Sequence, residues 1–153
     1  VFASIGPTGK MLVTKETTEA ELAEVYEEQA RAQFLGGADA IVVETMIDVV
    51  EAGIAAASAK KTGLPVIACM AYDSGPDKDT TMMGNTPEQV VGELTAIGVD
   101  GIGANCGQKV ALSPGSAEAS PCIRGDRWGF SLLFAHEMVV LVLFRCKLFT
   151  YEQ

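Results

Sequence analysis

Apolar positions in the first two thirds of the chain switch between a strand-like and a helix-like period. The first helix-like stretch places its apolar residues every fourth position on one face: Leu22, Tyr26, Ala30 and Phe34. Thr18 and Glu21 stand before it with the spacing of a capping box, and Gly36-Gly37 follows it. This pattern predicts an amphipathic helix between Thr18 and Gly36.

Two further helices are predicted from their start and stop signals. Asp48 and Glu51 repeat the capping spacing, with Gly63 marking the end of that helix. Thr86 and Gln89 have the same spacing at the start of the third helix. Short apolar runs between the helices predict strands near residues 1–6, 39–44, 65–72 and 99–105. Strands joined by single helices imply right-handed crossovers, so we expect a parallel sheet in sequence order.

An internal repeat places two polar residues at equivalent strand ends. The segment 37–41 leads to Glu44, and the similar segment 98–102 leads to Asn105. In parallel α/β folds, and above all in barrels, the carboxyl edge of the strands carries the chemistry. No GxGxxG motif follows any strand, which favours a barrel over a dinucleotide-binding sheet. The predicted fold is α/β: a partial (β/α)8 TIM barrel of about four consecutive parallel β/α units.

The pattern changes after Gln108. Residues 113–121 are rich in Pro, Gly and Ser, and residues 128–149 are apolar with neither a clean helical nor a clean strand period. We therefore expect residues 1–108 to form the partial barrel domain and residues 109–153 to be a divergent apolar tail that fits no further β/α unit.

Composition limits the classes of binding partner and the cellular compartment that we expect for this protein. The formal net charge of −9 argues against nucleic acid and anionic membrane surfaces as partners. Four widely spaced cysteines without a CxxC pair, and no leader-like start, indicate a cytoplasmic protein with reduced thiols. Charged residues interrupt the apolar stretch 130–149, so no transmembrane segment is predicted.

Cys106 is the sharpest candidate for chemistry. It follows Asn105 at the end of a strand and lies between Gly103 and Gly107, where a metal or an electrophile has access. Packing as a small buried hydrophobe is the alternative, because nothing nearby in the sequence completes a ligand set. Glu44 ends an apolar strand, where a carboxylate needs a bound cation, a lysine or a backbone amide as its partner.

Other motifs carry weaker signals. Gly6-Pro7-Thr8-Gly9 is either a tight turn beneath a ligand or an ordinary turn, and residues 73–85 are either a lid or a polar connection. His136 is the sole histidine and lies in the tail, so no Cys-His pair is argued. Cys69 fits core packing, while Cys122 and Cys146 receive no role.

Four motifs together resemble a known family. In chain order they are Ser4–Gly9, Ile41–Thr45 with Asp48, Thr80–Gly84, and Gly101–Cys106. Their order and spacing resemble consecutive strand ends of the homocysteine S-methyltransferase family, and the Gly-Pro-Thr-Gly form is most similar to the homocysteine-binding modules of cobalamin-dependent methionine synthases. The resemblance covers about the first two thirds of the chain.

The resemblance implies a fold, a reaction and a set of site residues. The family has an eight-stranded α/β barrel in which the cysteine matching Cys106 is one of three thiolate ligands to zinc. The residues matching Glu44 and Asn105 are implied to hold the substrate, homocysteine. The implied reaction is methyl transfer to the zinc-activated thiolate of homocysteine, which yields methionine. The implied methyl donor is methylcobalamin or derives from methyltetrahydrofolate, with a cobalamin domain or protein as partner.

The chain departs from the family in one ligand motif. The other two zinc ligands of the family are an adjacent cysteine pair, and this sequence has no Cys-Cys. We therefore expect a truncated barrel that neither binds zinc tightly nor methylates homocysteine on its own. Two alternatives stay open: a non-catalytic α/β fragment that self-associates through open sheet edges, or another barrel enzyme, such as a pterin-binding methyltransferase, in which Cys106 only packs.

Overall fold

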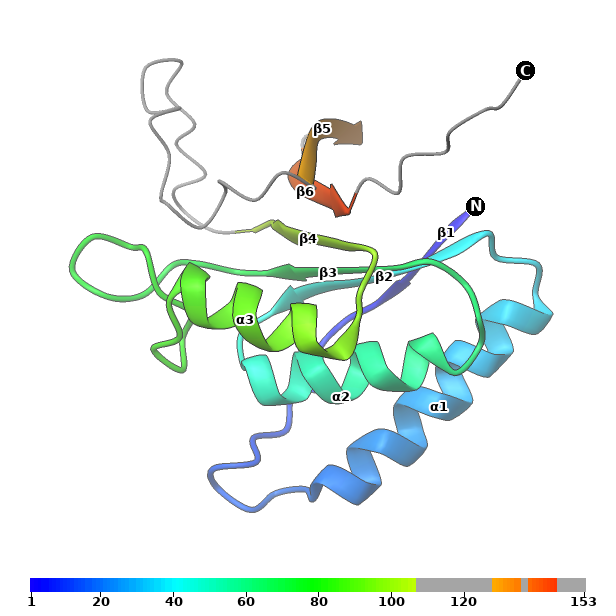
Figure 1. The fold of residues 1–153 in the computed structure, drawn as a ribbon. Helices are drawn as coiled ribbons and strands as arrows, with labels where there is room; N and C mark the ends of the chain where they lie inside the picture. The colour runs from blue at the N-terminus through cyan, green and yellow to red at the C-terminus, as the bar shows by residue number, and fades with distance from the viewer. Residues whose placement is uncertain (107–127, 136–137, 146–153) are drawn as a thin grey trace, which may run out of the picture.

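The computed structural model describes residues 1–106, 128–135 and 138–145. The strands are β1 (Phe2–Ile5), β2 (Ala40–Met46), β3 (Val66–Met70), β4 (Gly101–Ala104), β5 (Trp128–Ala135) and β6 (Met138–Arg145). The helices are α1 (Glu19–Leu35), α2 (Val49–Lys60) and α3 (Pro87–Ile97). All six strands belong to one sheet, in the order β1-β2-β3-β4-β6-β5 (Figure 1).

Strands β1 to β4 are parallel and adjacent in sequence order, which confirms the predicted α/β architecture. Each is joined to the next by one helix, as a right-handed crossover requires. The register pairs Ser4 with Val42 and Cys69 with Gly103. The carboxyl ends of these four strands therefore share one edge of the sheet.

Capping signals set the helix starts. At the starts of α1 and α3, Thr18 with Glu21 and Thr86 with Gln89 form the two predicted capping boxes. The third predicted box is wrong. Asp48 does cap α2, accepting a hydrogen bond from the backbone N–H of Val50 at 2.8 Å, but the Glu51 side chain bonds elsewhere.

Residues 128–145 contain strands where the sequence pattern predicts no regular element. β5 and β6 pair antiparallel with each other, and β6 pairs antiparallel with β4, so the parallel order ends there. A continuous apolar run has no period that separates a strand from a helix. The pairing of β6 with β4 depends on residues about forty positions earlier in the chain, and a local sequence pattern does not contain this information.

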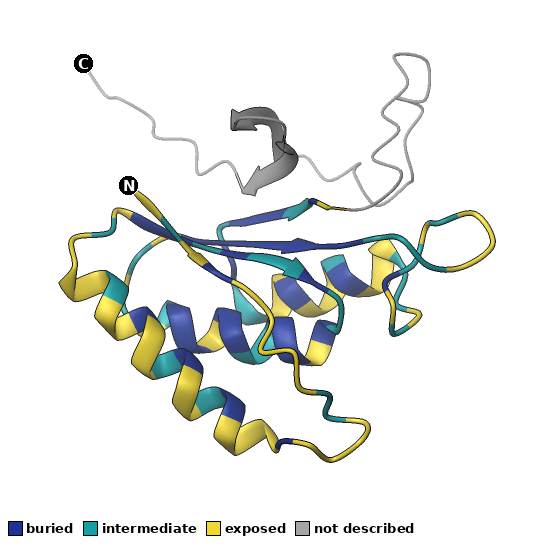
Figure 2. Ribbon diagram, turned by 180° about the vertical axis from the view of Figure 1, so that it is seen from behind, coloured by how far each residue is buried: buried dark blue, intermediate teal, exposed yellow. Residues whose placement is uncertain are grey.

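The two faces of the parallel strands differ in their cover. Helices α1, α2 and α3 lie along one face, and Figure 2 shows their buried residues turned toward the sheet. The main core lies there, with Ile41, Val43 and Met70 fully buried. The opposite face carries a smaller cluster of Ile67 and Cys69. Among residues 1–106, the helix-covered face thus supplies most of the packing energy.

Within the described residues, no helix has the length and apolar character needed to cross a membrane.

Candidate functional site

Five residues meet where β1, β2 and β4 end. We call them the strand-end cluster: Ser4, Glu44, Thr45, Asn105 and Cys106. The sequence predicts Glu44, Asn105 and Cys106 for this edge, and the structure brings these three residues together. Ser4 and Thr45 join them without having been predicted as site residues.

Glu44 is held by one residue of β1, the neighbouring strand, and by one residue that follows β4. The Ser4 hydroxyl donates a hydrogen bond to Glu44 Oε1, and Asn105 Nδ2 donates to Glu44 Oε2 at 3.2 Å. Each carboxylate oxygen thus has a neutral donor, and the side chain is half-buried. A carboxylate fixed by neutral donors keeps its negative charge available to a cationic group of a ligand.

Asn105 is the centre of the cluster and is fully buried. Its Oδ1 accepts a hydrogen bond from the backbone N–H of Thr45 at 2.9 Å, and its Nδ2 donates to Thr45 Oγ1 at 3.0 Å. Its own backbone N–H bonds the carbonyl of Met70 at 3.1 Å. Asn105 therefore joins the ends of β2, β3 and β4 into one rigid unit.

Thr45 and Cys106 both have left-handed backbones, with φ of 59° and 56°. A β-branched residue is a genuine outlier in this region, and such strain costs about 1–3 kcal/mol per residue. The Thr45 hydroxyl donates to Cys106 Sγ at 3.5 Å, while Asn105 Nδ2 lies 3.8 Å from the same sulfur. Cys106 is exposed, so its sulfur is both hydrogen-bonded and accessible.

A second group of polar residues, which we call the clamp, comprises Thr8, Tyr26 and Glu51. Glu51 is buried, and its Oε1 accepts from Thr8 N (2.8 Å), Thr8 Oγ1 (2.7 Å) and Tyr26 Oη (2.7 Å). Burial and the Glu51 carboxylate raise the pKa of Tyr26 above its usual range. The clamp fixes Thr8 of the Gly6-Pro7-Thr8-Gly9 motif against α1 and α2, and a ligand above this motif stays a prediction.

The remaining sequence candidates have separate positions. Cys69 is fully buried, and burial, with a smaller effect of the Glu44 charge, raises the pKa of its thiol to about 12, as expected of a packing residue. The loop 73–85 contains a short bridge between Ser74 and Thr80. His136, Cys122 and Cys146 lie outside the described residues.

Metal ligation by the described residues is limited to one candidate. Across residues 1–106, and the two short strands described after them, no group of three or more His, Cys, Asp or Glu side chains converges as a metal site. Cys106 is the predicted ligand at the carboxyl edge, and one thiol alone does not meet the ligand count of zinc. The described residues therefore do not fit a complete zinc site.

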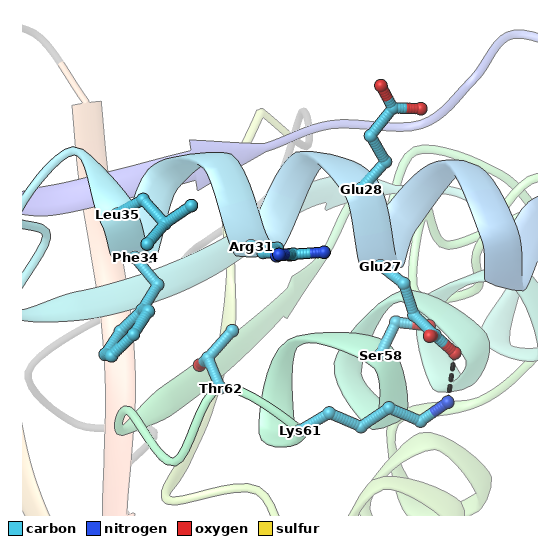
Figure 3. Close-up of a pocket in the computed structure, with 8 residues that line it drawn as sticks. All are labelled: Glu27, Glu28, Arg31, Phe34, Leu35, Ser58, Lys61 and Thr62. Carbon is cyan, nitrogen blue, oxygen red and sulfur yellow. Dashed lines mark hydrogen bonds and ion pairs between the residues drawn. The ribbon is translucent and has the colours of Figure 1, made fainter.

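Two cavities lined by described residues lie on the helical side of the molecule. One, of about 450 Å³, is lined by the second half of α1 and the end of α2, including Arg31, Phe34 and Thr62. Two of its lining residues, Lys61 and Glu27, form an ion pair at one side of the cavity (Figure 3). The other, of about 480 Å³, lies between the Gly6–Gly9 turn and α1. Neither is lined by a residue of the strand-end cluster.

Comparisons with known proteins show the family of the chain and support its fold. A family model described as homocysteine S-methyltransferase matches residues 1–125. Methionine synthase from Mycobacterium tuberculosis is 29% identical over 130 residues, which is 81% of this chain and 10% of that protein. The crystal structure of the homocysteine methyltransferase MmuM from Escherichia coli, in its apo form, has a TM-score of 0.55 at 19% identity and supports the barrel fold.

The matched regions are parts of larger proteins. The chain spans about a tenth of the methionine synthase, and the structural match covers 67% of this chain and 37% of the homocysteine methyltransferase. Four parallel strands in one sheet are consistent with part of a barrel.

Proposed function

Because the chain belongs to the homocysteine S-methyltransferase family, as the match over residues 1–125 shows, we propose that its strand-end cluster is part of a site that binds homocysteine and directs a methyl group to its sulfur. The observation that carries this proposal is the convergence of Glu44, Asn105 and Cys106 at one sheet edge. In parallel barrels, catalytic residues lie at this edge.

Glu44 is assigned to the ammonium group of homocysteine. Its carboxylate is held by Ser4 and Asn105, both neutral, so its charge has no cationic partner among these contacts. A half-buried carboxylate of this kind gains a charge-assisted hydrogen bond when an ammonium group approaches. Asn105 is assigned to hold Glu44 in place, and through Glu44 to hold the substrate.

Cys106 is assigned as one thiolate ligand of zinc, in a site that other groups complete. Zinc with three protein ligands leaves a fourth position in which a substrate thiol binds as the thiolate at neutral pH. On this assignment the described residues supply one of those ligands, and no group of three ligating side chains converges among them. What these residues contribute is an accessible sulfur beside the carboxylate that binds the amino acid.

The proposed methyl transfer forms one bond and breaks one. Homocysteine first loses its thiol proton. The thiolate then attacks the methyl carbon of the donor, the S–C bond forms, the methyl–donor bond breaks with its electron pair staying on the donor, and methionine results. The similarity to a methionine synthase supports methylcobalamin or a methyltetrahydrofolate-derived donor, presented by a cobalamin domain or protein. Both the donor and this partner are part of the proposal.

The first test measures the binding of homocysteine to the 153-residue chain, by calorimetry or by NMR titration. Glu44→Gln removes the charge and keeps the shape, and we expect it to weaken binding about tenfold or more, because a hydrogen bond to a charged group contributes about 1.5–3 kcal/mol. Glu93→Gln is the matched control, since Glu93 is an exposed carboxylate on α3.

Homoserine, which replaces the thiol with a hydroxyl, is the control ligand. Equal binding of homocysteine by the Glu44→Gln variant and the unaltered chain would remove Glu44 from the site. No binding by the unaltered chain would contradict the proposal as a whole.

A further inference from the structure

The hydrogen bonds of Thr45 assign a direction to its hydroxyl proton. The backbone N–H of Thr45 requires an acceptor, so the Asn105 atom 2.9 Å away is the amide oxygen, and the other amide atom is the donor Nδ2. Nδ2 donates to Thr45 Oγ1 at 3.0 Å. A hydroxyl has a single proton, and with Oγ1 already accepting from Asn105 that proton is free for the Cys106 sulfur, 3.5 Å away.

The backbone conformation at this point is an independent observation. Thr45, with φ of 59°, is a β-branched residue in the left-handed region, and Cys106, with φ of 56°, has the same unusual backbone on the other side of the contact. Strained residues of this kind persist where the surrounding bonds over-determine them, and they cluster at functional sites. Here the bonds of Asn105 to both the backbone and the side chain of Thr45 are the determining contacts.

We propose that Thr45 is a positioning residue for Cys106, whose sulfur it holds in one orientation by donating its hydroxyl hydrogen bond. The resulting chain of contacts runs from Glu44 through Asn105 and Thr45 to the sulfur, so that the residue assigned to the amino acid and the residue assigned to the metal share one rigid support. Outer hydrogen bonds that orient a ligating side chain are a general requirement of metal sites. The inference rests on the proposed function of this edge.

The test measures the side-chain orientation of Cys106 directly. In the isotope-labelled 153-residue chain, kept reduced, three-bond couplings about the Cα–Cβ bond report whether Cys106 populates one staggered rotamer or several. A single rotamer gives either one large and one small Hα–Hβ coupling or two small ones, whereas averaging over rotamers gives two intermediate values. We expect a single rotamer in the unaltered chain, and an averaged Cys106 there would overturn the proposal without any variant.

Two substitutions separate the hydroxyl from the shape of Thr45. Thr45→Val keeps the β-branched shape and its backbone strain but removes the proton donor, so the single-rotamer couplings of Cys106 should be replaced by two intermediate values. Thr45→Ser keeps the hydroxyl and should retain the single-rotamer couplings. Thermal unfolding followed by circular dichroism checks that both variants fold.

Two outcomes would contradict the role of the hydroxyl: an unchanged pattern in Thr45→Val, or equal averaging in Thr45→Ser and Thr45→Val. Because the couplings are measured without homocysteine or metal, this result is separate from the binding test. If homocysteine does not bind, the proposed function is contradicted, but the contact between Thr45 and Cys106 is not. If the Cys106 couplings are averaged while homocysteine still binds in a Glu44-dependent way, only the role of Thr45 is contradicted.

Discussion

Two carboxylates near the same edge of the sheet have opposite surroundings. Glu51, in the clamp, is 4% exposed and accepts three hydrogen bonds on one oxygen from Thr8 and Tyr26. Glu44, in the strand-end cluster, is half-buried and accepts one hydrogen bond on each oxygen, from Ser4 and Asn105. Both are held by neutral donors, so their difference lies in access.

That difference separates a structural carboxylate from one suited to a ligand. Burying a carboxylate is costly unless its hydrogen bonds are made, and Glu51 meets this condition within the fold. Glu44 keeps part of its surface open beside the accessible sulfur of Cys106. The same contrast holds for two thiols, because Cys69 is buried in β3 while Cys106 is exposed.

The largest expected effect is on stability. Glu51→Ala removes the acceptor of three hydrogen bonds and leaves the buried Tyr26 hydroxyl with its longer contact to the Gly6 carbonyl, at 3.3 Å, so we expect a loss of about 3 kcal/mol in the free energy of unfolding. Glu44→Ala should cost about 1 kcal/mol, because its side chain is closer to water. Urea denaturation measures both, and Glu24→Ala, at an exposed site on α1, is the control. Equal losses of stability in Glu51→Ala and Glu44→Ala would contradict the claim that the two carboxylates differ in their structural role.

The next largest effect is expected in the alkylation rates of the two thiols, Cys69 and Cys106. Burial raises the pKa of Cys69 to about 12, and its side chain has no solvent access, so we expect iodoacetamide at pH 8 to modify Cys106 faster by a factor on the order of 100. Trypsin places Cys69 and Cys106 in different peptides, residues 62–78 and 79–109, so mass spectrometry follows each rate. Comparable rates in the folded chain would show that the two thiols do not differ in access.

Local signals explain why most of the barrel portion was predictable. Capping boxes at Thr18 and Thr86, and apolar runs between helices, are short-range features, and they located the helices and the four parallel strands correctly. The repeat that matches Glu44 with Asn105 likewise depends on the strand ends alone. Each of these features depends on residues that lie only a few positions apart, so it can be recognised in the sequence alone.

The remaining features depend on contacts between distant segments. Glu51 has capping spacing to Asp48, yet its side chain bonds Thr8 and Tyr26, which are 43 and 25 positions away. Ser4 and Thr45 are ordinary residues until the register brings Ser4 to Glu44 and Thr45 to Asn105. A tyrosine in the apolar stripe of α1 was the one local hint of a buried acceptor, because a buried hydroxyl needs a partner.

The central claim is that the ligand site is the strand-end cluster, and amide chemical-shift mapping of the labelled 153-residue chain with homocysteine tests it most directly. The account predicts the largest shifts at residues 44–46 and 104–106, with those shifts lost in Glu44→Gln and retained in Glu93→Gln. Shifts confined to the clamp around Thr8 and Tyr26, or to the cavity beside Phe34 and Thr62, would contradict it.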